Sequence, residues 1–296
     1  MRKLMVVFTV TCWVAASTAD GQCRPGKESN EARLLAFYSA PIAFSPASAP
    51  EYQPPWAFRI GVEGGLIPDP DPQIQKPGAC SLNRAENIEL SRFFARPRLA
   101  LALPGHFAIE AAYVPPIRIN ESEPNLGSLA ISKTLRIRRE DMGNPTTAMV
   151  RLHGTAGRVS GPISCPKKSL QQTNAAQSCF GTTPSKDTFR PTMFSLEGIL
   201  STAAYDGRMG FYGGAGVTFL RPRFQSGFTD GLGSIDNTRV EADLTRGVIL
   251  GGVSLQASTV LDLSAQVYSV RRDVTTLRFG AGYHMQARQD RTAMHR

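Results

Sequence analysis

The amino-acid sequence predicts an all-β protein, folded as an antiparallel up-and-down β-barrel of about ten strands, with eight or twelve as the neighbouring possibilities. Three observations favour this fold class. Apolar and polar residues alternate with a period of two in many segments. The connections between those segments alternate between short and long. An export signal precedes them all. A sheet with one apolar face can close on itself and turn that face toward lipid.

The first 21 residues are typical of a cleaved signal peptide. Two basic residues precede the apolar run Leu4–Ala16, and we expect cleavage after Ala19 or Gly21. The run is short for a membrane-spanning helix, and no other stretch approaches the ~20 apolar residues that such a helix needs. We therefore expect an exported chain located in the outer membrane of the cell, with a periplasmic or secreted protein as the alternative.

Residues 22–55 differ in composition from the rest of the chain. Glu31–Tyr38 is predicted to form a short helix, with Ser29 or Asn30 as its cap. A proline-rich stretch follows and predicts an extended linker. We expect this whole segment to be periplasmic and loosely ordered.

Strands with a period of two fill residues 56–286, and residues 287–296 form a polar basic tail. In the last strand, alternate residues make an apolar face: Leu277, Phe279, Ala281, Tyr283 and Met285. The segment Arg239–Leu255 changes phase near Arg246, which predicts a bulge. The predicted strands are Trp56–Leu66, Arg96–Leu103, His106–Val114, Leu126–Arg138, Ala148–Ser160, Thr192–Ala204, Arg208–Leu220, Arg239–Leu255, Val260–Val270 and Thr275–Gln286.

The connections sort into two sets. Short ones at Pro104–Gly105, Arg139–Thr147, Tyr205–Gly207 and Gln256–Thr259 alternate with long ones at Ile67–Ala95, Pro115–Asn125, Gly161–Pro191 and Arg221–Thr238. Bacterial transmembrane barrels have this asymmetry, with short periplasmic turns and long outer loops. Segment lengths match the ~9–11 residues that cross a bilayer at a tilt. Aromatic residues near the strand ends also suit the two membrane interfaces.

The polar face of the strands carries many charges. In a soluble β-sandwich they would face water, whereas in a narrow barrel they would face inward and pair with one another. We expect an interior polar network of Arg59, Glu63, Arg98, Glu110, Arg136, Arg151, Glu197, Glu241, Asp243 and Arg278. The loop alternation and the aromatic positions favour the membrane interpretation.

The last strand resembles the C-terminal assembly signal of bacterial outer-membrane β-barrels, in their small porin-like form. Arg278, Gly280, Tyr283 and Met285 occupy the polar, glycine, aromatic and apolar places of that pattern in order. The resemblance implies recognition by the barrel assembly machinery and pairing of this strand with Trp56–Leu66. The basic tail departs from the pattern, because the family often ends at or just after this strand.

Four cysteines remain after signal cleavage, in an oxidising compartment. Cys165 and Cys179 bracket one polar loop, and we expect a disulfide between them. The pairing of Cys23 and Cys80 stays open. No histidine lies at zinc-like spacing, so we expect no metal and no cofactor.

A ten-stranded barrel is too narrow for an open channel unless its interior residues are small. The sequence therefore favours a non-enzymatic barrel with a structural, surface or narrow porin-like role. One alternative is a secreted soluble β-barrel that binds a ligand. Another is an outer-membrane lipid deacylase, with His153 and Glu197 as candidates but no recognisable nucleophile beside them.

The expected partners follow from the predicted location. They are outer-membrane lipid, lipopolysaccharide and the assembly machinery. Nucleic acid is not expected, because the net charge of +9 comes from scattered rather than clustered basic residues. Loop cations such as Lys167, Lys168, Arg221 and Arg223 could contact lipopolysaccharide phosphates.

Overall fold

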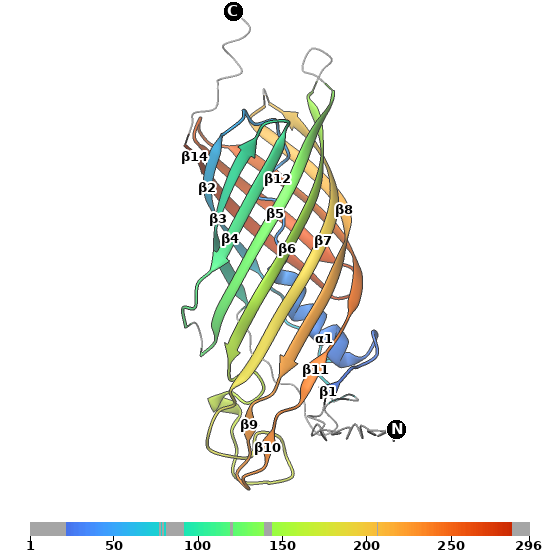
Figure 1. Ribbon diagram of the computed structural model, residues 1–296, viewed down its shortest axis with the longest axis vertical. Coiled ribbons are helices and arrows are strands. Elements are labelled where there is room, and N and C mark those ends of the chain that lie inside the picture. The colour runs from blue at the N-terminus through green and yellow to red at the C-terminus, as the bar shows by residue number, and fades with distance from the viewer. Residues whose placement is uncertain are drawn as a thin grey trace, which may run out of the picture.

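The computed structural model is one closed antiparallel barrel of ten strands (Figure 1). It describes residues 22–76, 78, 80, 92–118, 121–138, 144–205 and 207–285. The barrel fold and the strand number of ten confirm the predicted fold class. The expected signal peptide and the basic tail lie outside the described residues.

The ten strands follow one another around the wall in chain order. They are β2 (Phe58–Leu66), β3 (Phe93–Leu103), β4 (Phe107–Val114), β5 (Glu123–Arg138), β6 (Thr146–Gly161), β7 (Asp187–Ala204), β8 (Met209–Gln225), β12 (Leu244–Gln256), β13 (Leu261–Val270) and β14 (Val274–His284). The last strand closes the barrel against the first, with Tyr283 opposite Ile60 and Phe279 opposite Gly64. This is the pairing that the sequence predicts.

The two ends of the barrel differ as the connections predict. One end carries short turns, such as the turn from Leu103 to Phe107. The other end carries the long connections, which include β9 (Phe228–Thr229), β10 (Ile235–Asp236), β11 (Arg239–Glu241) and the 3-10 turn η3 (Lys167–Ser169). The short strand β1 (Gln22–Cys23) pairs with β11 at this loop end, so residue 22 and the long loops share one end (Figure 1).

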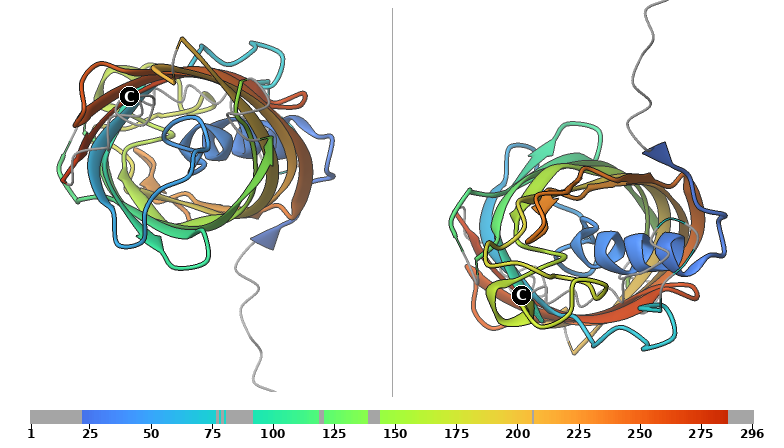
Figure 2. Two further views of the ribbon diagram at one scale, coloured as in Figure 1. Left: turned by 90° about the horizontal axis from the view of Figure 1, so that it is seen from above. Right: turned by 90° about the horizontal axis from the view of Figure 1, so that it is seen from below.

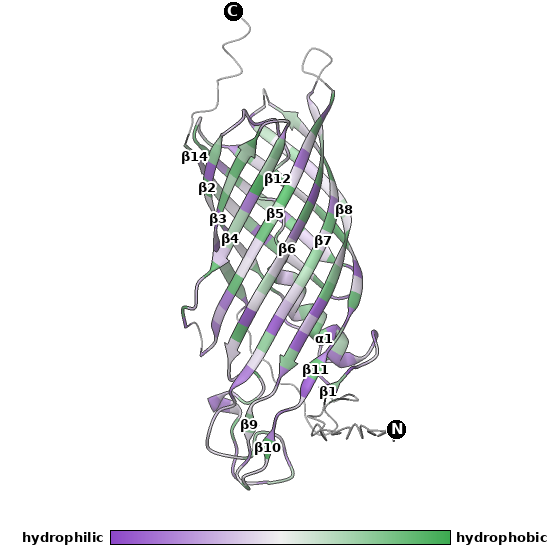
Figure 3. Cartoon of the chain, viewed as in Figure 1, coloured by the Kyte–Doolittle hydropathy of each residue, from purple (hydrophilic) through white to green (hydrophobic). Residues whose placement is uncertain are grey.

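The outer face of the wall is apolar. Leucine, isoleucine, valine and phenylalanine side chains on every wall strand point outward and are exposed, for example Leu129, Ile249 and Phe279. Along several strands they alternate with hydrophilic residues (Figure 3). Among the described residues, no helix is long and apolar enough to span a membrane.

The N-terminal region runs through the inside of the barrel, and this corrects the expectation for residues 22–55. Helix α1 (Asn30–Ser39) and the 3-10 turn η1 (Ala40–Ile42) lie within the ring of strands when the barrel is seen along its axis (Figure 2). The chain then continues, extended and mostly buried, toward the short-turn end. We call residues 30–52 the lumenal segment. Its proline-rich part is extended as predicted, but interior side chains bind it, so it is not a loose segment outside the barrel.

Helix α1 forms where the sequence predicts a helix. The hydroxyl of Ser29 caps it by accepting a hydrogen bond from the backbone N–H of Ala32 at 3.2 Å. Ala32, Leu34, Ala36 and Phe37 are buried against the inner wall. The helix thus fills the loop end of the lumen with apolar side chains.

The wall facing α1 departs from the rule that apolar residues point outward. Val240, Leu244 and Val248, on β11 and β12, point inward and pack in the same cluster as the helix. Glu241 and Asp243 alternate with them and therefore lie on the outer side. The bulge predicted near Arg246 is wrong, because Leu244 to Leu255 of β12 pair with Leu220 to Met209 of β8 in unbroken register. The apolar residues of this stretch point inward because the helix supplies an apolar partner inside the barrel.

Candidate functional site

The polar half of the lumen is organised around the buried carboxylate of Glu63 on β2. Three guanidinium groups surround it. Its Oε2 lies 3.0 Å from Nη2 of Arg96 and 2.6 Å from Nη1 of Arg98, and its Oε1 lies 3.4 Å from Nη1 of Arg278. All four side chains are at most 5% exposed. One carboxylate thus faces three buried cations, so the cations need further acceptors.

A chain of ion pairs continues from this hub around the inner wall. Arg98 donates to Glu110 at 2.5 Å, and Arg151 donates to the other oxygen of Glu110 at 3.2 Å. Arg151 also lies 3.7 Å from Glu197, whose other oxygen is 3.0 Å from Nε2 of His153. The network therefore links β2, β3, β4, β6 and β7 through side chains that are removed from water.

The remaining acceptors are backbone carbonyls of the lumenal segment. Arg96 donates to the carbonyls of Ile42 and Ala43, each at 2.8 Å. Arg278 donates to the carbonyls of Ala43 at 2.7 Å and Pro41 at 3.0 Å. Residues 40–44 have no strand partner, so few backbone donors reach these carbonyls, although that of Ala43 also accepts from the N–H of Ser45 at 3.1 Å. The arginines and the segment therefore satisfy one another.

The side chain of Phe44 adds a second kind of contact at the same place. Its fully buried ring lies 4.3 Å from the guanidinium carbon of Arg98, 4.9 Å from that of Arg96 and 5.0 Å from that of Arg151. Arg151 also donates to the carbonyl of Phe44. Guanidinium groups are attracted to aromatic faces, most strongly away from water. Phe44 thus anchors the segment among the cations.

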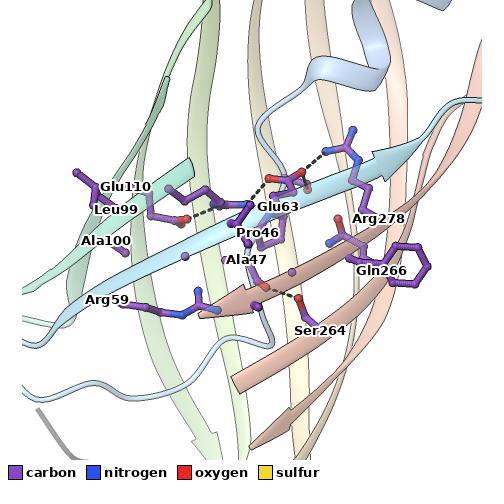
Figure 4. A pocket seen from close by; sticks show the side chains of 17 residues that line it. Pro46, Ala47, Arg59, Glu63, Leu99, Ala100, Glu110, Ser264, Gln266 and Arg278 are labelled. Atoms are coloured by element: carbon purple, nitrogen blue, oxygen red, sulfur yellow. Dashed lines mark hydrogen bonds and ion pairs between the residues drawn. The ribbon is translucent and has the colours of Figure 1, made fainter. Parts of the chain in front are cut away.

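Between Phe44 and the short-turn end, fewer hydrogen bonds hold the segment. Ser264 donates to the carbonyl of Ala47 at 2.7 Å, and Ser201 donates to that of Pro50 at 2.6 Å. A small pocket of about 20 Å³ lies between the segment and the wall (Figure 4). The lining atoms Gln266 Oε1 and Arg98 Nε are buried without a hydrogen-bond partner among the described residues. A polar pocket of this size suits about one water molecule.

Most of the predicted interior network is present. Glu63, Arg98, Glu110, Arg151, Glu197 and Arg278 meet as described above, and Arg59 pairs with Asp262, which also contacts His284 at 2.8 Å. Three predicted members are not part of it. Arg136 is exposed at the short-turn mouth, where it lies over the Tyr52 ring at 4.3 Å. Glu241 and Asp243 face outward, because the apolar residues that alternate with them, Val240 and Leu244, point into the lumen.

Sequence reasoning missed Arg96 as a member of the network. Arg96 lies two residues before Arg98 on the same strand, so the period of two does place both on one face. It also missed what the cations bind, since no pattern in the sequence pairs residues 40–44 with strand residues.

The histidine considered for catalysis lies inside this network. The register of β6 and β7 places His153 opposite Ser195, a pairing that was not recognised from the sequence. However, the Ser195 hydroxyl donates to Thr218 at 2.8 Å rather than to the histidine, and both side chains are buried. Tyr268 donates to Glu197 at 3.1 Å. Among the described residues there is also no metal-binding group of histidine, cysteine and acidic side chains.

Two disulfides fix the loop end. Cys165 and Cys179 are bonded as predicted, with their Cα atoms 5.4 Å apart. Cys23 and Cys80 form the second bond, which the sequence left open. The buried carboxylate of Asp187 accepts hydrogen bonds from Ser164, Ser185 and the backbone of Gly227 and so joins the first disulfide loop to β9. The loop end is therefore a cross-linked unit.

The residues of the predicted assembly signal divide between the two faces of β14. Tyr283 and Met285 point outward and are exposed, whereas Arg278 points into the lumen and binds the segment. Gly280 also faces inward, where a Cβ would lie 2.5 Å from the Ser264 hydroxyl oxygen. Arg278 and Gly280 thus have a role in packing inside the barrel. Recognition of this strand by the assembly machinery stays a prediction.

A closed antiparallel barrel with an even strand number, an apolar outer face, a polar lumen and long loops at one end defines the small bacterial outer-membrane β-barrel proteins. No protein-family model matches this chain, and no curated protein matches its sequence.

Comparison with solved structures gives distant matches. The chain is similar to Ail, the attachment invasion locus protein of Yersinia pestis, with 11% identity over 77% of this chain and 97% of that one, at a TM-score of 0.31. It is similar to the translocator domain of the autotransporter NalP from Neisseria meningitidis, with 12% identity over 79% and 90%, at 0.34. It is also similar to the KdgM porin, with 10% identity over 77% and 99%, at 0.31.

Proposed function

We propose that this chain is a non-enzymatic outer-membrane β-barrel, exported by a cleaved signal peptide, whose own lumenal segment closes the barrel at rest. Its role is to present the cross-linked loop end at the cell surface, with at most a narrow, porin-like conductance. The observation that carries the proposal is the set of arginine side chains bonded to the carbonyls of residues 40–44.

The apolar outer face supports a membrane barrel over a secreted soluble one. Exposed leucine, valine and phenylalanine side chains surround the wall, and a soluble barrel would expose them to water. The charges that would solubilise a sandwich are instead buried inside. We therefore do not favour the soluble ligand-binding alternative.

The contents of the lumen support a closed barrel. Helix α1 lies within the ring of strands at the loop end (Figure 2). The extended part of the segment passes between the buried arginines toward the short-turn end. A solute would have to displace at least four hydrogen bonds between arginines and backbone. This favours a structural or surface role over that of an open porin.

The surroundings of His153 support a non-enzymatic barrel. Both His153 and Ser195 lie inside the wall, under the lumenal segment, where a lipid substrate has no route to them. Ser195 is bonded to Thr218 and not to the histidine, so no activated nucleophile is formed. We expect the parent protein and His153→Asn to hydrolyse phospholipid and lipid A equally little. Hydrolysis by the parent that His153→Asn abolishes would establish the deacylase alternative.

Planar-bilayer recordings test the closed lumen. The exported chain should insert and give little or no conductance, whereas a variant lacking residues 30–50 should give steady open channels. Heat-modifiable migration in unboiled gels shows whether each variant has folded. If the parent conducts as freely as the deletion variant, the segment does not close the barrel.

A second measurement covers the case in which the deletion variant fails to fold. Single cysteines can replace Ala43, which is buried against the arginines, and Ser258, which lies in a short turn. We expect a water-soluble maleimide to label the Ser258→Cys protein rapidly and the Ala43→Cys protein only after denaturation. Equal labelling of the two folded proteins would contradict a closed lumen.

A further inference from the structure

Three arginines form a row across the outer face of the wall near the loop end. Arg190 on β7 lies directly opposite Arg223 on β8. The register that pairs Val159 with Phe189 places Arg158 on β6 opposite Arg190. The three side chains therefore occupy neighbouring places on three adjacent strands.

These arginines point away from the lumen. The residues that alternate with them, Phe189 and Phe224, pack into the interior cluster. The side chain of Arg223 is 59% exposed, and that of Arg221, two residues earlier on β8, is 74% exposed. Arg158 and Arg190 are exposed as well. The row and Arg221 thus make one basic patch on the outside of the barrel.

The charge of this patch is only partly balanced. Glu241 lies 3.6 Å from Arg223, and Asp243 lies 3.6 Å from Arg221, both along its β11 edge. Within the described chain, Arg158 and Arg190 have no carboxylate at ion-pair distance. Like charges directly opposite each other on a sheet repel. An arrangement of this kind calls for an anion from outside the chain.

The level of the patch on the barrel indicates which anion can reach it. Phe194 and Phe219 form an exposed stacked pair on the same outer face, with ring centroids 6.5 Å apart. Transmembrane barrels carry girdles of aromatic residues at both membrane interfaces. Arg190 precedes Phe194 by four residues, roughly 13 Å along an extended strand, in the direction of the loops. The patch therefore lies just beyond the apolar belt, at the depth of headgroup phosphates.

We propose that Arg158, Arg190, Arg221 and Arg223 form a docking site for the phosphate groups of an outer-leaflet glycolipid, the lipid A part of lipopolysaccharide. The proposal rests on the proposed function, which places the loop end outside the cell. Guanidinium groups bind phosphate oxygens in pairs and through charge, and two phosphates on one glycolipid can bridge neighbouring arginines. The acyl chains of the same lipid would then lie along the apolar belt beside Phe194 and Phe219.

Binding of diphosphoryl lipid A to the full exported chain in detergent micelles tests this site, with native mass spectrometry or a fluorescent lipid as the readout. The triple variant Arg158→Gln, Arg190→Gln, Arg223→Gln should bind at least about tenfold more weakly, since each basic residue at an anionic lipid surface contributes about 1 kcal/mol. A matched control replaces three loop cations at the same end, Lys167→Gln, Lys168→Gln, Lys186→Gln. It loses the same charge and should bind like the parent.

The outcomes are distinguishable. Equal binding by the triple variant and the parent, or equal loss in the lysine control, would overturn a specific arginine site. Displacement of lipid A by millimolar inorganic phosphate would assign the patch to free phosphate instead. The single variant Arg190→Gln gives the same comparison with a smaller loss if the triple variant does not fold. Bilayer conductance of the parent protein is recorded in parallel. Steady conductance would contradict the proposed closed barrel, but it would not change the result of the lipid A binding measurement.

Discussion

The two halves of the lumen hold the same segment by different means, because only one of them adds a network of buried charges. At the loop end, α1 packs its leucines, alanines and Phe37 against inward apolar residues of the wall, such as Leu220, Val248 and Tyr268. Farther along, residues 40–50 still bury Ala40, Ala43 and Ala49 in the same cluster, but they are also bound through their carbonyls by arginines and serines. One half resembles the core of a soluble protein, and the other combines small apolar contacts with a polar network.

The difference follows from backbone chemistry. A helix satisfies its own N–H and C=O groups, so its surroundings need only match its side chains. An extended strand inside a closed wall has no neighbour for its backbone groups, so the wall must supply donors. The arginines of β3, β6 and β14 supply them, and they need Glu63, Glu110 and Glu197 to balance their charge. The interior charged side chains thus pair with one another, and the arginines among them also bind the backbone of the lumenal segment.

Removing β14 should have the largest effect, because it destroys the wall that both halves need. A chain lacking residues 275–296 loses the pairings with β13 and β2 and the Arg278 side chain, so we expect no membrane insertion. A chain lacking only residues 287–296 should insert normally. Recovery in outer-membrane fractions and heat-modifiable migration measure this. Insertion of the shorter chain would show that neither half depends on closure.

The polar half should be the more sensitive of the two to a single change. Glu63→Gln removes the carboxylate that faces Arg96, Arg98 and Arg278, and leaves buried charge unbalanced. We expect a loss of about 3–5 kcal/mol in the free energy of unfolding, measured by urea titration in lipid vesicles. Asp243→Asn removes an exposed carboxylate and serves as the control, with about 0.5 kcal/mol or less expected. A loss at Glu63 as small as that of the control would show that the hub is not needed.

In the apolar half, a truncated side chain should lower the free energy of unfolding through loss of packing. Leu34→Ala in α1 removes a side chain that is 4% exposed and leaves a cavity against the wall. We expect a loss of about 2–3 kcal/mol in the same titration, because the mouth of the barrel lets the helix relax partly. Lys27→Ala, just before the helix, should change nothing measurable. If Leu34→Ala is as harmless as Lys27→Ala, the helix is not packed as a core.

The smallest effect is expected at the beginning of the helix. Ser29→Ala removes the hydroxyl that caps Ala32 and should cost about 1 kcal/mol. Ser29→Asp restores an acceptor there and should recover most of the loss. Unfolding midpoints of the three proteins in urea provide the measurement. Equal midpoints for Ser29→Ala and the parent would mean that wall packing alone positions α1.

The wall could be predicted from the sequence because its physical signal is local. Alternation with a period of two, as in Leu277 to Met285, requires only that one face of a strand is apolar and the other polar. Turn residues such as Pro104 and Gly105 then mark the ends of strands. Strand order follows, since neighbouring strands in an up-and-down barrel are neighbours in the chain.

The lumenal segment could not be placed in this way. Proline and small residues at positions 40–50 predict an extended chain, but nothing local distinguishes an extended chain in a lumen from one in solution. The inward orientation of Val240 and Leu244 could not be predicted for the same reason. It is explained only once the helix is known to lie inside the barrel. Both errors come from contacts between residues that are distant in the sequence.

The bond between Cys23 and Cys80 has a mechanical consequence. Residues 23–80 run up the inside of the barrel, turn at the short-turn end and return as β2 in the wall, and the disulfide joins the two ends of this hairpin. The segment is therefore fastened covalently at both mouths and cannot be drawn out at either one while the bond is intact. Any opening in the oxidised protein has to be a sideways shift of the extended half within the lumen. Full withdrawal first requires a reductant, or the release of β2 from its neighbours.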